Sequence, residues 1–305
     1  MIKHNLHTVI ILLLLVSNGV LLNAQEKVSV LIIDGFSNHN WQLNTSYLTK
    51  ILEASGKFKV DVSTCPIKKN NETEWNNWKP DFQQYPVVIQ TCNNLGKEDI
   101  SNWPDTIKKS FEDYVSNGGG VYIYHGATNA FKNWEVYNKM IGLAWRNKDF
   151  GKSIIIDENE NAVWIPKGEG ERTNHGPRSN VLVTRMNNHP IHKGMPKSWL
   201  TADNEVYRYA RTITDSIQVI SYARGSKNEF NFPKEWVLKY GKGKIYASTY
   251  GHLWKEQIWP PSMRCVAFQE TMTRALLWLS GNKIDAIVSA DFPTSNNIAL
   301  RKILK

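Results

Sequence analysis

The apolar and polar residues follow the period of a strand in some segments and the period of a helix in others. Runs that are apolar throughout, or that alternate with polar residues, are typical of strands. The first half of the chain has such runs at 28–33, 58–62, 86–90 and 121–124. Apolar positions three or four residues apart predict helices over 43–54, 107–115 and 131–141. Because strands and helices alternate, we predict an α/β fold with a doubly wound, mostly parallel sheet and helices on both faces.

The pattern is less regular between about residues 145 and 215, where short strands at 153–156 and 181–184 are separated by loops rich in Asn, Gly and Pro. Strands return at 217–222, 235–240 and 244–249. A closing helix is expected from Ser262, as its N-cap, to Leu279, with Gly281 ending it. We find no repeat and no linker. We therefore predict one domain over 25–282 with an elaborated middle insertion, and leave the tail at 283–305 unassigned.

The N-terminus has the pattern of a secretory signal peptide over residues 1–24. Lys3 precedes an apolar run at 9–16, and small and polar residues follow up to Ala24. The run is too short to span a bilayer as a stable helix. No Cys follows that could accept a lipid. We expect cleavage after Ala24 and a periplasmic or secreted protein that does not insert into the membrane after cleavage.

Composition narrows the classes of partner. The chain has 305 residues, of which 41% are hydrophobic and 21% charged, so wholesale disorder is excluded. The net charge of +9 is spread over short pairs such as Lys108-Lys109 without a basic run, so we expect no nucleic-acid partner. The 12 tryptophans exceed what a core needs and suggest flat ring surfaces for a ligand. Nothing in the pattern indicates an oligomeric state.

The cysteines carry no clear chemistry. The chain has three, Cys65, Cys92 and Cys265, so at least one has no partner within the chain. Cys92 ends an apolar run and Cys265 lies in a predicted helix. We expect buried free thiols.

Histidines stand where predicted strands end. His39 follows the first strand, His125 the fourth and His252 the last. The carboxyl ends of parallel strands lie at one edge of a sheet, where ligands bind, so we expect these three side chains to share a site. Their role stays open between two alternatives. They are acid/base groups that titrate near neutral pH, or ligands of a divalent metal such as zinc.

Other polar and aromatic residues are expected at the same edge. The middle insertion should fold over it and bring His175 and Glu205 close, while Asn93 follows the third strand. Trp41 and Tyr207 would then form the walls. A polar floor between aromatic walls suits a small carbohydrate, because rings pack against its C–H surface and polar side chains satisfy its hydroxyls.

Several segments carry a family resemblance in their order and spacing. They are Asn38-His39-Asn40-Trp41 and the segments 118–125, 129–131, 175–177, 189–196, 204–207, 240–244, 251–252 and 263–266. Together they resemble the ThuA-like (trehalose utilisation) family of the class I glutamine amidotransferase-like superfamily. The resemblance implies a flavodoxin-like fold and a part in carbohydrate catabolism. The chain departs from the family pattern at Asn204 and Leu253, where Asp is usual, and each departure removes a carboxylate.

The superfamily resemblance also permits an exclusion. Glutamine amidotransferases place a nucleophilic Cys on the turn after a central strand, with a His partner. Here that turn carries His125, and Cys92 follows a different strand. We therefore predict that the protein is not a glutamine amidotransferase.

Three functions remain open at this point. In the first, the protein is an enzyme, a hydrolase, lyase or isomerase of a sugar or keto-glycoside. Its catalytic residues would be His125, His252 and Glu205, and its substrate-binding residues His39, Trp41, Asn93, His175 and Tyr207. In the second, it binds carbohydrate without catalysis and stacks it on Trp41, Trp134 and Trp254. In the third, it is an interaction module that retains an inherited cleft.

Export is directly testable. Because a signal peptide is removed during secretion, we expect protein from the native cell envelope to begin at Gln25. Intact-mass spectrometry of that fraction measures the cleavage. Full-length protein recovered from the cytoplasm would contradict the prediction.

Overall fold

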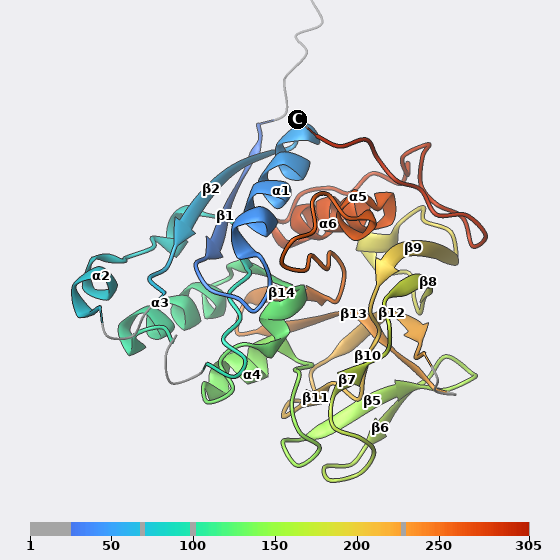
Figure 1. Ribbon diagram of the computed structural model, residues 1–305, viewed down its shortest axis with the longest axis horizontal. Helices are drawn as coiled ribbons and strands as arrows, with labels where there is room; N and C mark the ends of the chain where they lie inside the picture. The colour runs from blue at the N-terminus through green and yellow to red at the C-terminus, as the bar shows by residue number, and fades with distance from the viewer. Residues whose placement is uncertain (1–25, 68–70, 98–101, 227–229, 305) are drawn as a thin grey trace, which may run out of the picture.

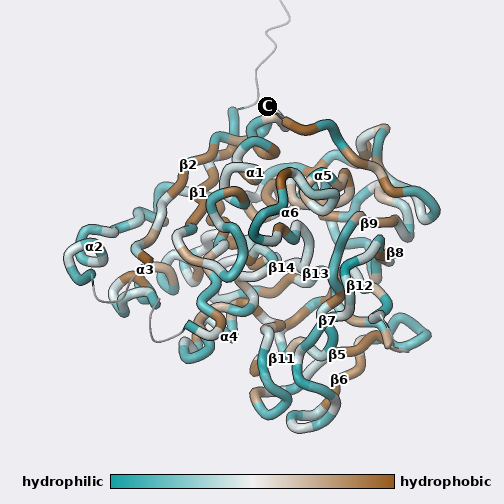
Figure 2. Tube along the Cα trace, viewed as in Figure 1, coloured by the Kyte–Doolittle hydropathy of each residue, from teal (hydrophilic) through white to brown (hydrophobic). Residues whose placement is uncertain are grey.

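The computed structural model describes residues 26–67, 71–97, 102–226 and 230–304 (Figure 1). The predicted signal peptide lies outside these residues. Within them, 12 strands form one mixed sheet and two short strands form a second. In Figure 2 hydrophobic residues follow the strands of the sheet, whereas hydrophilic residues dominate the outlying helix α2 (Glu72–Asn77) and many peripheral turns. None of the helices in these ranges is both long and apolar enough to cross a membrane.

The parallel part of the sheet has the strand order of a flavodoxin-like fold. Five neighbouring strands run in the same direction in the order β2 (Phe58–Thr64), β1 (Val28–Asp34), β3 (Val87–Gln90), β4 (Gly120–Tyr124) and β14 (Gly243–Ser248). Each strand lies within two residues of its predicted range. The predicted flavodoxin-like α/β class is confirmed, although the 12-stranded sheet as a whole is mixed rather than mostly parallel. The carboxyl ends of these five strands form one edge.

The middle insertion and the next two strands of the chain widen the sheet beyond β14. β13 (Asn231–Tyr240), β12 (Gln218–Arg224), β8 (Ser179–Arg185) and β9 (Ser198–Asn204) continue it in antiparallel fashion. The remaining strands of the insertion are short: β5 (Lys152–Ile156), β6 (Ala162–Ile165) and β11 (Arg211–Thr212) attach to this sheet, and β7 (Asn174–His175) pairs with β10 (Tyr207–Arg208). The pattern had not predicted β9 or β6, because β6 is largely exposed and β9 lacks a regular alternation.

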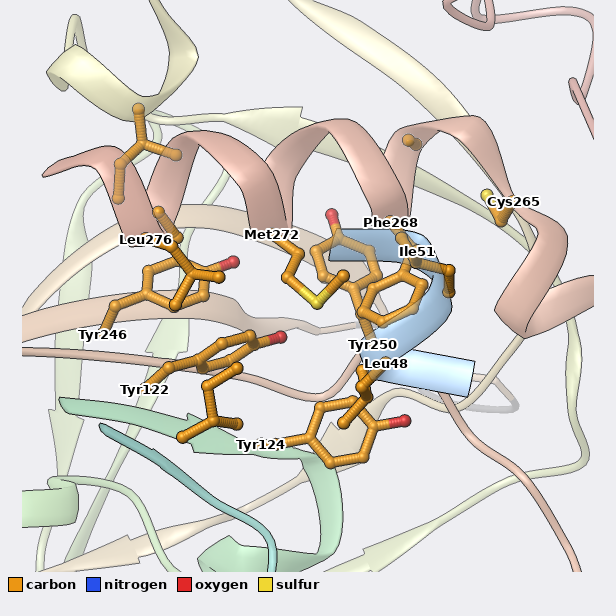
Figure 3. Packing of buried hydrophobic residues seen from close by; sticks show 14 of the residues in the cluster. Leu48, Ile51, Tyr122, Tyr124, Tyr246, Tyr250, Cys265, Phe268, Met272 and Leu276 are labelled. Carbon is orange, nitrogen blue, oxygen red and sulfur yellow. The ribbon is translucent and has the colours of Figure 1, made fainter. Parts of the chain in front are cut away.

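Helices cover both faces of the parallel strands. α1 (Trp41–Ala54), α5 (Pro261–Arg264) and α6 (Val266–Leu279) pack on one face, and α3 (Asp105–Ser116) and α4 (Glu135–Ile141) on the other. Successive strand residues point to opposite faces. Tyr122 and Tyr124 of β4 therefore reach the α1 and α6 face, whereas Val121 and Ile123 reach the other. Figure 3 shows these tyrosines packed beneath α6 together with Phe268, Met272 and Leu276.

The closing helix is interrupted, contrary to the prediction. It breaks at Cys265, whose extended backbone ends α5 and precedes α6. Contacts with the C-terminal tail explain the break. Leu300 forms a β-bridge with Cys265, and the amide of Val266 donates to the carbonyl of Ala299. Ser262 is not the N-cap, because α5 begins one residue earlier and the Ser262 hydroxyl donates to the carbonyl of His252. α4 also begins four residues later than predicted.

The tail at 283–304 lies against α6 and β9. Arg274 of α6 is buried and donates to the carbonyls of Lys193, Asp285 and Ile287. The amide of Leu200 in β9 donates to the carbonyl of Thr294. The tail therefore satisfies backbone groups that would otherwise remain unpaired.

The three cysteines are free and buried, as predicted. Cys65 and Cys92 follow β2 and β3, and their sulfur atoms are 3.5 Å apart. Burial raises the pKa of the Cys92 thiol well above its usual value. Cys92 therefore lacks the thiolate that a nucleophilic cysteine requires.

Packing of α6 on the sheet predicts a large effect for Phe268→Ala. The Phe268 side chain is fully buried, and its ring centroid lies 6.2 Å from that of Tyr124. Its truncation should lower the free energy of unfolding by about 3–5 kcal/mol through lost burial and a cavity. Urea denaturation measures this. Thr273→Ala, on the half-buried side of α6, is the control, and equal effects for the two variants would show that α6 does not depend on this contact.

Candidate functional site

Three histidines from distant parts of the chain lie together at the carboxyl edge of the parallel strands. His39 follows β1, His125 follows β4 and His252 follows β14. Their ring centroids are 5.0–5.2 Å apart, and the rings of each pair are 80–90° apart. One nitrogen of each ring lies within 4.8 Å of the corresponding nitrogens of the other two. We refer to these three residues as the histidine cluster.

The backbone at His125 is strained in a way that directs its imidazole. His125 has φ of +38°, an uncommon value for a residue other than Gly, and it begins a 3-10 turn over His125–Asn129. The next residue, Gly126, leaves room for the neighbouring side chains. A Cβ atom there would lie 3.3 Å from His39 Nδ1 and 3.2 Å from Asn93 Nδ2. The turn therefore allows His39 and His125 to approach each other.

The hydrogen bonds of His125 define its tautomer. Its Nδ1 lies 3.2 Å from the carbonyl oxygen of Thr249, which only accepts, so Nδ1 carries the proton and donates. Its Nε2 is buried and has no hydrogen-bond partner among the described residues. A neutral imidazole with this tautomer has its Nε2 lone pair free. His125 is therefore able to accept a proton or bind a metal at Nε2.

Glu205 of the middle insertion is the carboxylate nearest to the histidine cluster. One of its oxygens lies 3.4 Å from His252 Nε2 and 3.6 Å from His175 Nε2, and the other lies 4.0 Å from His125 Nε2. Glu205 is buried, whereas His175 is exposed. The insertion thus places both residues at the edge where the sequence predicted them.

Arg178, which the sequence interpretation did not single out, controls the tautomer of His252. Its Nη1 donates to His252 Nδ1 at 2.9 Å and to Gln257 Oε1 at 2.9 Å. A guanidinium has no acceptor, so His252 Nδ1 accepts, and in a neutral ring the proton lies on Nε2. His252 Nε2–H then faces Glu205. Asp203 Oδ2, 3.5 Å from Arg178 Nη1, balances part of the guanidinium charge.

A fully buried lysine on β13 holds the two loops that carry these groups. Lys234 Nζ donates to Asn204 Oδ1 at 3.2 Å and to the carbonyl of Glu205 at 2.8 Å. It also reaches the carbonyl of Thr249 at 3.0 Å and the Thr249 hydroxyl at 2.8 Å. Thr249 in turn accepts from His125. Lys234 therefore connects Glu205 with His125 through the backbone of both loops.

Burial keeps the histidine cluster uncharged near neutral pH. The pKa of His39 is lowered to about 4 and that of His252 to about 3, first by burial and then by nearby positive charges. The pKa of His125 is well below its usual value for the same reason, with His252 and His39 adding to the effect. Burial lowers the pKa of Lys234 to about 7 and raises that of Glu205. Desolvation of the charged form explains all five directions.

Aromatic side chains border the histidine cluster, though not all the predicted ones. The Trp254 ring lies 5.3 Å from that of His39 and 6.1 Å from that of His252, and 44% of Trp254 is exposed. Tyr207 lies 5.8 Å from His125 and is buried, and the half-buried Trp145 packs on Tyr207 at 5.0 Å. Trp254, Tyr207 and Trp145 therefore form the aromatic border.

Trp134 does not belong to this border, and the place of Trp41 at it stays a prediction. Trp41 is half-buried and begins α1, and no ring contact among the described residues joins it to the cluster. Trp134 is buried against Trp103 and Phe111 in the opposite core, and its Nε1 donates to Glu112. The prediction of Trp134 as a stacking face is wrong, because its ring is used in packing.

Asn93 and His175 lie at two sides of the cluster. Asn93 is buried, donates to Asn38 Oδ1 at 2.6 Å and accepts from the amide of Leu95, so its amide is engaged in holding the loop that contains His39. His175 borders an open hollow whose lining is otherwise mostly charged. The lining includes Lys148, Asp149, Glu171, Arg172, Asn174 and Arg208.

The two departures from the family pattern have structural roles in this chain. Asn204 accepts from Lys234 and donates to the carbonyl of Ala202 at 2.7 Å. Leu253 is fully buried in the hydrophobic core on the α1 and α6 face. Neither side chain supplies a ligand to the histidine cluster.

The sequence interpretation missed Arg178 and Lys234. Lys234 directly precedes the predicted strand at 235–240, and nothing in its sequence neighbours indicated that its amine would be buried. Arg178 follows the quoted His175-Gly176-Pro177 segment, but only the fold shows that it reaches His252. Loop-to-loop contacts of this kind leave no periodic signal.

The fold and the site define a class of protein, a flavodoxin-like α/β protein with a cluster of imidazoles and one buried carboxylate at the carboxyl edge of its sheet. The trehalose utilisation (ThuA) family model matches residues 29–279. The chain therefore belongs to the ThuA family.

Solved structures similar to this chain include one of the same family. A ThuA-like protein from Parabacteroides merdae has 28% identity and a TM-score of 0.82, covering 90% of this chain and 98% of its own. Agd3, described as a carbohydrate deacetylase, has 10% identity and a TM-score of 0.51 over 84% of this chain and 32% of its own, which shows similarity of fold alone. A glutamine amidotransferase from Thermotoga maritima also matches, with 10% identity and a TM-score of 0.34 over 73% of this chain and 75% of its own. No curated protein matches the chain.

The lowered histidine pKa values predict that acid destabilises the metal-free protein. Between pH 6.5 and about 4 the unfolded chain binds protons at His39 that the folded chain does not, so stability falls as the pH falls through this window. Urea denaturation in the presence of a chelator measures the slope. His39→Gln should reduce it, because Gln does not titrate. An unchanged slope in this variant would show that His39 is not held neutral in the fold.

Proposed function

We propose that this ThuA-family protein acts on a small carbohydrate at the histidine cluster, as an exported enzyme of carbohydrate catabolism. The observation that carries the proposal is the convergence of His125, His252 and Glu205 at the carboxyl edge of the sheet. The family description, trehalose utilisation, supports a disaccharide or a keto-glycoside derived from one. The apolar run before Ala24 supports export.

The geometry supports distinct roles for the three groups. His125 has a free Nε2 lone pair and a fixed Nδ1 proton, as a general base or a ligand requires. His252 presents Nε2–H beside Glu205, so the two form a donor and acceptor pair held by Arg178. Because burial raises the pKa of Glu205 whereas His252 stays neutral, Glu205 is the member of the pair suited to donating a proton to a leaving oxygen, or as a carboxylate to accepting one from a hydroxyl.

Substrate binding is proposed along the exposed border of the cluster. The half-exposed ring of Trp254 offers a face against which the C–H surface of a sugar packs. Beyond His175, the hollow offers Arg, Lys, Asn and carboxylate groups to sugar hydroxyls. The mixed charge of this lining favours a neutral polyol over a strongly charged ligand.

A non-catalytic carbohydrate-binding function is the second candidate, and Trp254 favours it. One exposed ring beside a polar cluster is sufficient for binding a sugar without chemistry. The two candidate functions differ in whether Glu205 transfers a proton to or from the bound carbohydrate or only contacts it.

The test is a panel of disaccharides and their keto derivatives incubated with the purified protein, with NMR detection of products and calorimetric detection of binding. His125→Ala, His252→Ala and Glu205→Gln should each lower turnover by about 10²-fold or more, since each removes a group proposed to move a proton. Circular dichroism checks that the variants fold.

Glu158→Gln is the matched control, because Glu158 is an exposed carboxylate between β5 and β6 that belongs neither to the cluster nor to the lining of the hollow. It should retain turnover. Binding without turnover in the wild type would favour the second candidate. Wild-type behaviour of all three cluster variants would refute the enzyme proposal.

A further inference from the structure

We propose that His39, His125 and His252 bind one divalent transition-metal ion, of which zinc fits the donors best. This inference rests on the proposed function for the substrate and deepens it by naming a cofactor for the same site. Metal binding is measured without any sugar, so the metal proposal and the proposed function can fail separately.

The convergence of the donor atoms is the first argument. One nitrogen of each of the three rings lies within 4.8 Å of the others. In a tetrahedral zinc site with Zn–N of about 2.0–2.1 Å, nitrogen ligands lie about 3.4 Å apart. The nitrogens therefore need to close by at most roughly 1.4 Å, which side-chain rotation supplies.

The unsatisfied Nε2 of His125 is the second and independent argument. The side chain is 2% exposed, and Nε2 has no hydrogen-bond partner among the described residues. Burying a polar atom without a hydrogen-bond partner costs free energy, and a bound ion is one of the explanations for such an atom. The Nδ1 proton is held by the Thr249 carbonyl, an arrangement that fixes the tautomer of metal-binding histidines.

The donor set indicates the kind of metal and site. Three neutral imidazoles suit zinc and related transition metals better than magnesium or calcium, which prefer oxygen ligands. Three protein ligands leave a position open, as in catalytic zinc sites. A metal held there would supply Lewis-acid chemistry, and the Glu205 carboxylate, 3.4 Å from His252 Nε2, would balance part of its charge.

Arg178 is a competitor for this metal. While it donates to His252 Nδ1, the proton of a neutral His252 lies on Nε2, which then cannot be a ligand. Metal binding at Nε2 requires the proton to move to Nδ1 and Arg178 to release the ring. Arg178 has alternative partners in Gln257 and Asp203, and its side chain is 28% exposed, so it has room to move.

The experiment is calorimetric titration of the chelator-treated protein with ZnCl₂, with visible absorption of the Co²⁺ form as the readout of tetrahedral nitrogen coordination. We expect one equivalent to bind. His39→Gln, His125→Gln and His252→Gln should each weaken binding by more than about tenfold. His189→Asn is the control, because His189 lies outside the cluster, as the N-cap of the 3-10 turn Pro190–His192, and Asn retains a capping acceptor.

Arg178→Met provides the sharper test, with Arg172→Met, an exposed arginine of the hollow, as its control. Removing the competitor should tighten zinc binding, and the control should not. The proposal is overturned if no zinc binds the wild type, if the cluster variants bind as the wild type does, or if Arg178→Met leaves affinity unchanged. Turnover that persists fully in the metal-free protein would retain the proposed function while removing the metal from it.

Discussion

The amine of Lys234, buried without access to water, constrains the whole functional edge of the sheet. Burying an amine costs several kcal/mol unless acceptors surround it. Lys234 finds them in Asn204, Glu205 and Thr249, on two loops that are far apart in the chain. Because these contacts are to backbone carbonyls as well as side chains, moving either loop would leave the amine unsatisfied. A residue of the antiparallel extension thereby positions Glu205 and Thr249 at the carboxyl edge of the parallel strands.

Charge balance explains why the cluster is stable in a buried position. His39, His125 and His252 are neutral near pH 7, because burial and mutual proximity disfavour imidazolium. The ionisable groups beside them form pairs of opposite sign: Glu205 lies near Lys234, and Arg178 lies near Asp203. A fixed network of this kind needs little reorganisation when a ligand or a proton arrives.

The fold is shared with proteins of different chemistry, so the function has to be argued from the strand ends. The strained turn after β4 carries His125 with a free lone pair. The cysteine nearest in sequence, Cys92, is buried with its thiol protonated. An imidazole with a free lone pair at this turn is suited to acid/base or metal chemistry rather than to covalent catalysis by a thiol.

The sequence by itself determined the parallel strands, their helices and the presence of His39, His125 and His252 at one edge. Buried strands have a distinct hydrophobic period, and parallel strands end on the same side. Only the tertiary structure decided that Arg178 and Lys234 enter the site, that Trp134 is core and that the closing helix breaks at Cys265. These outcomes depend on contacts between loops and the C-terminal tail, which are set by three-dimensional packing and leave no periodic trace in the order of the residues.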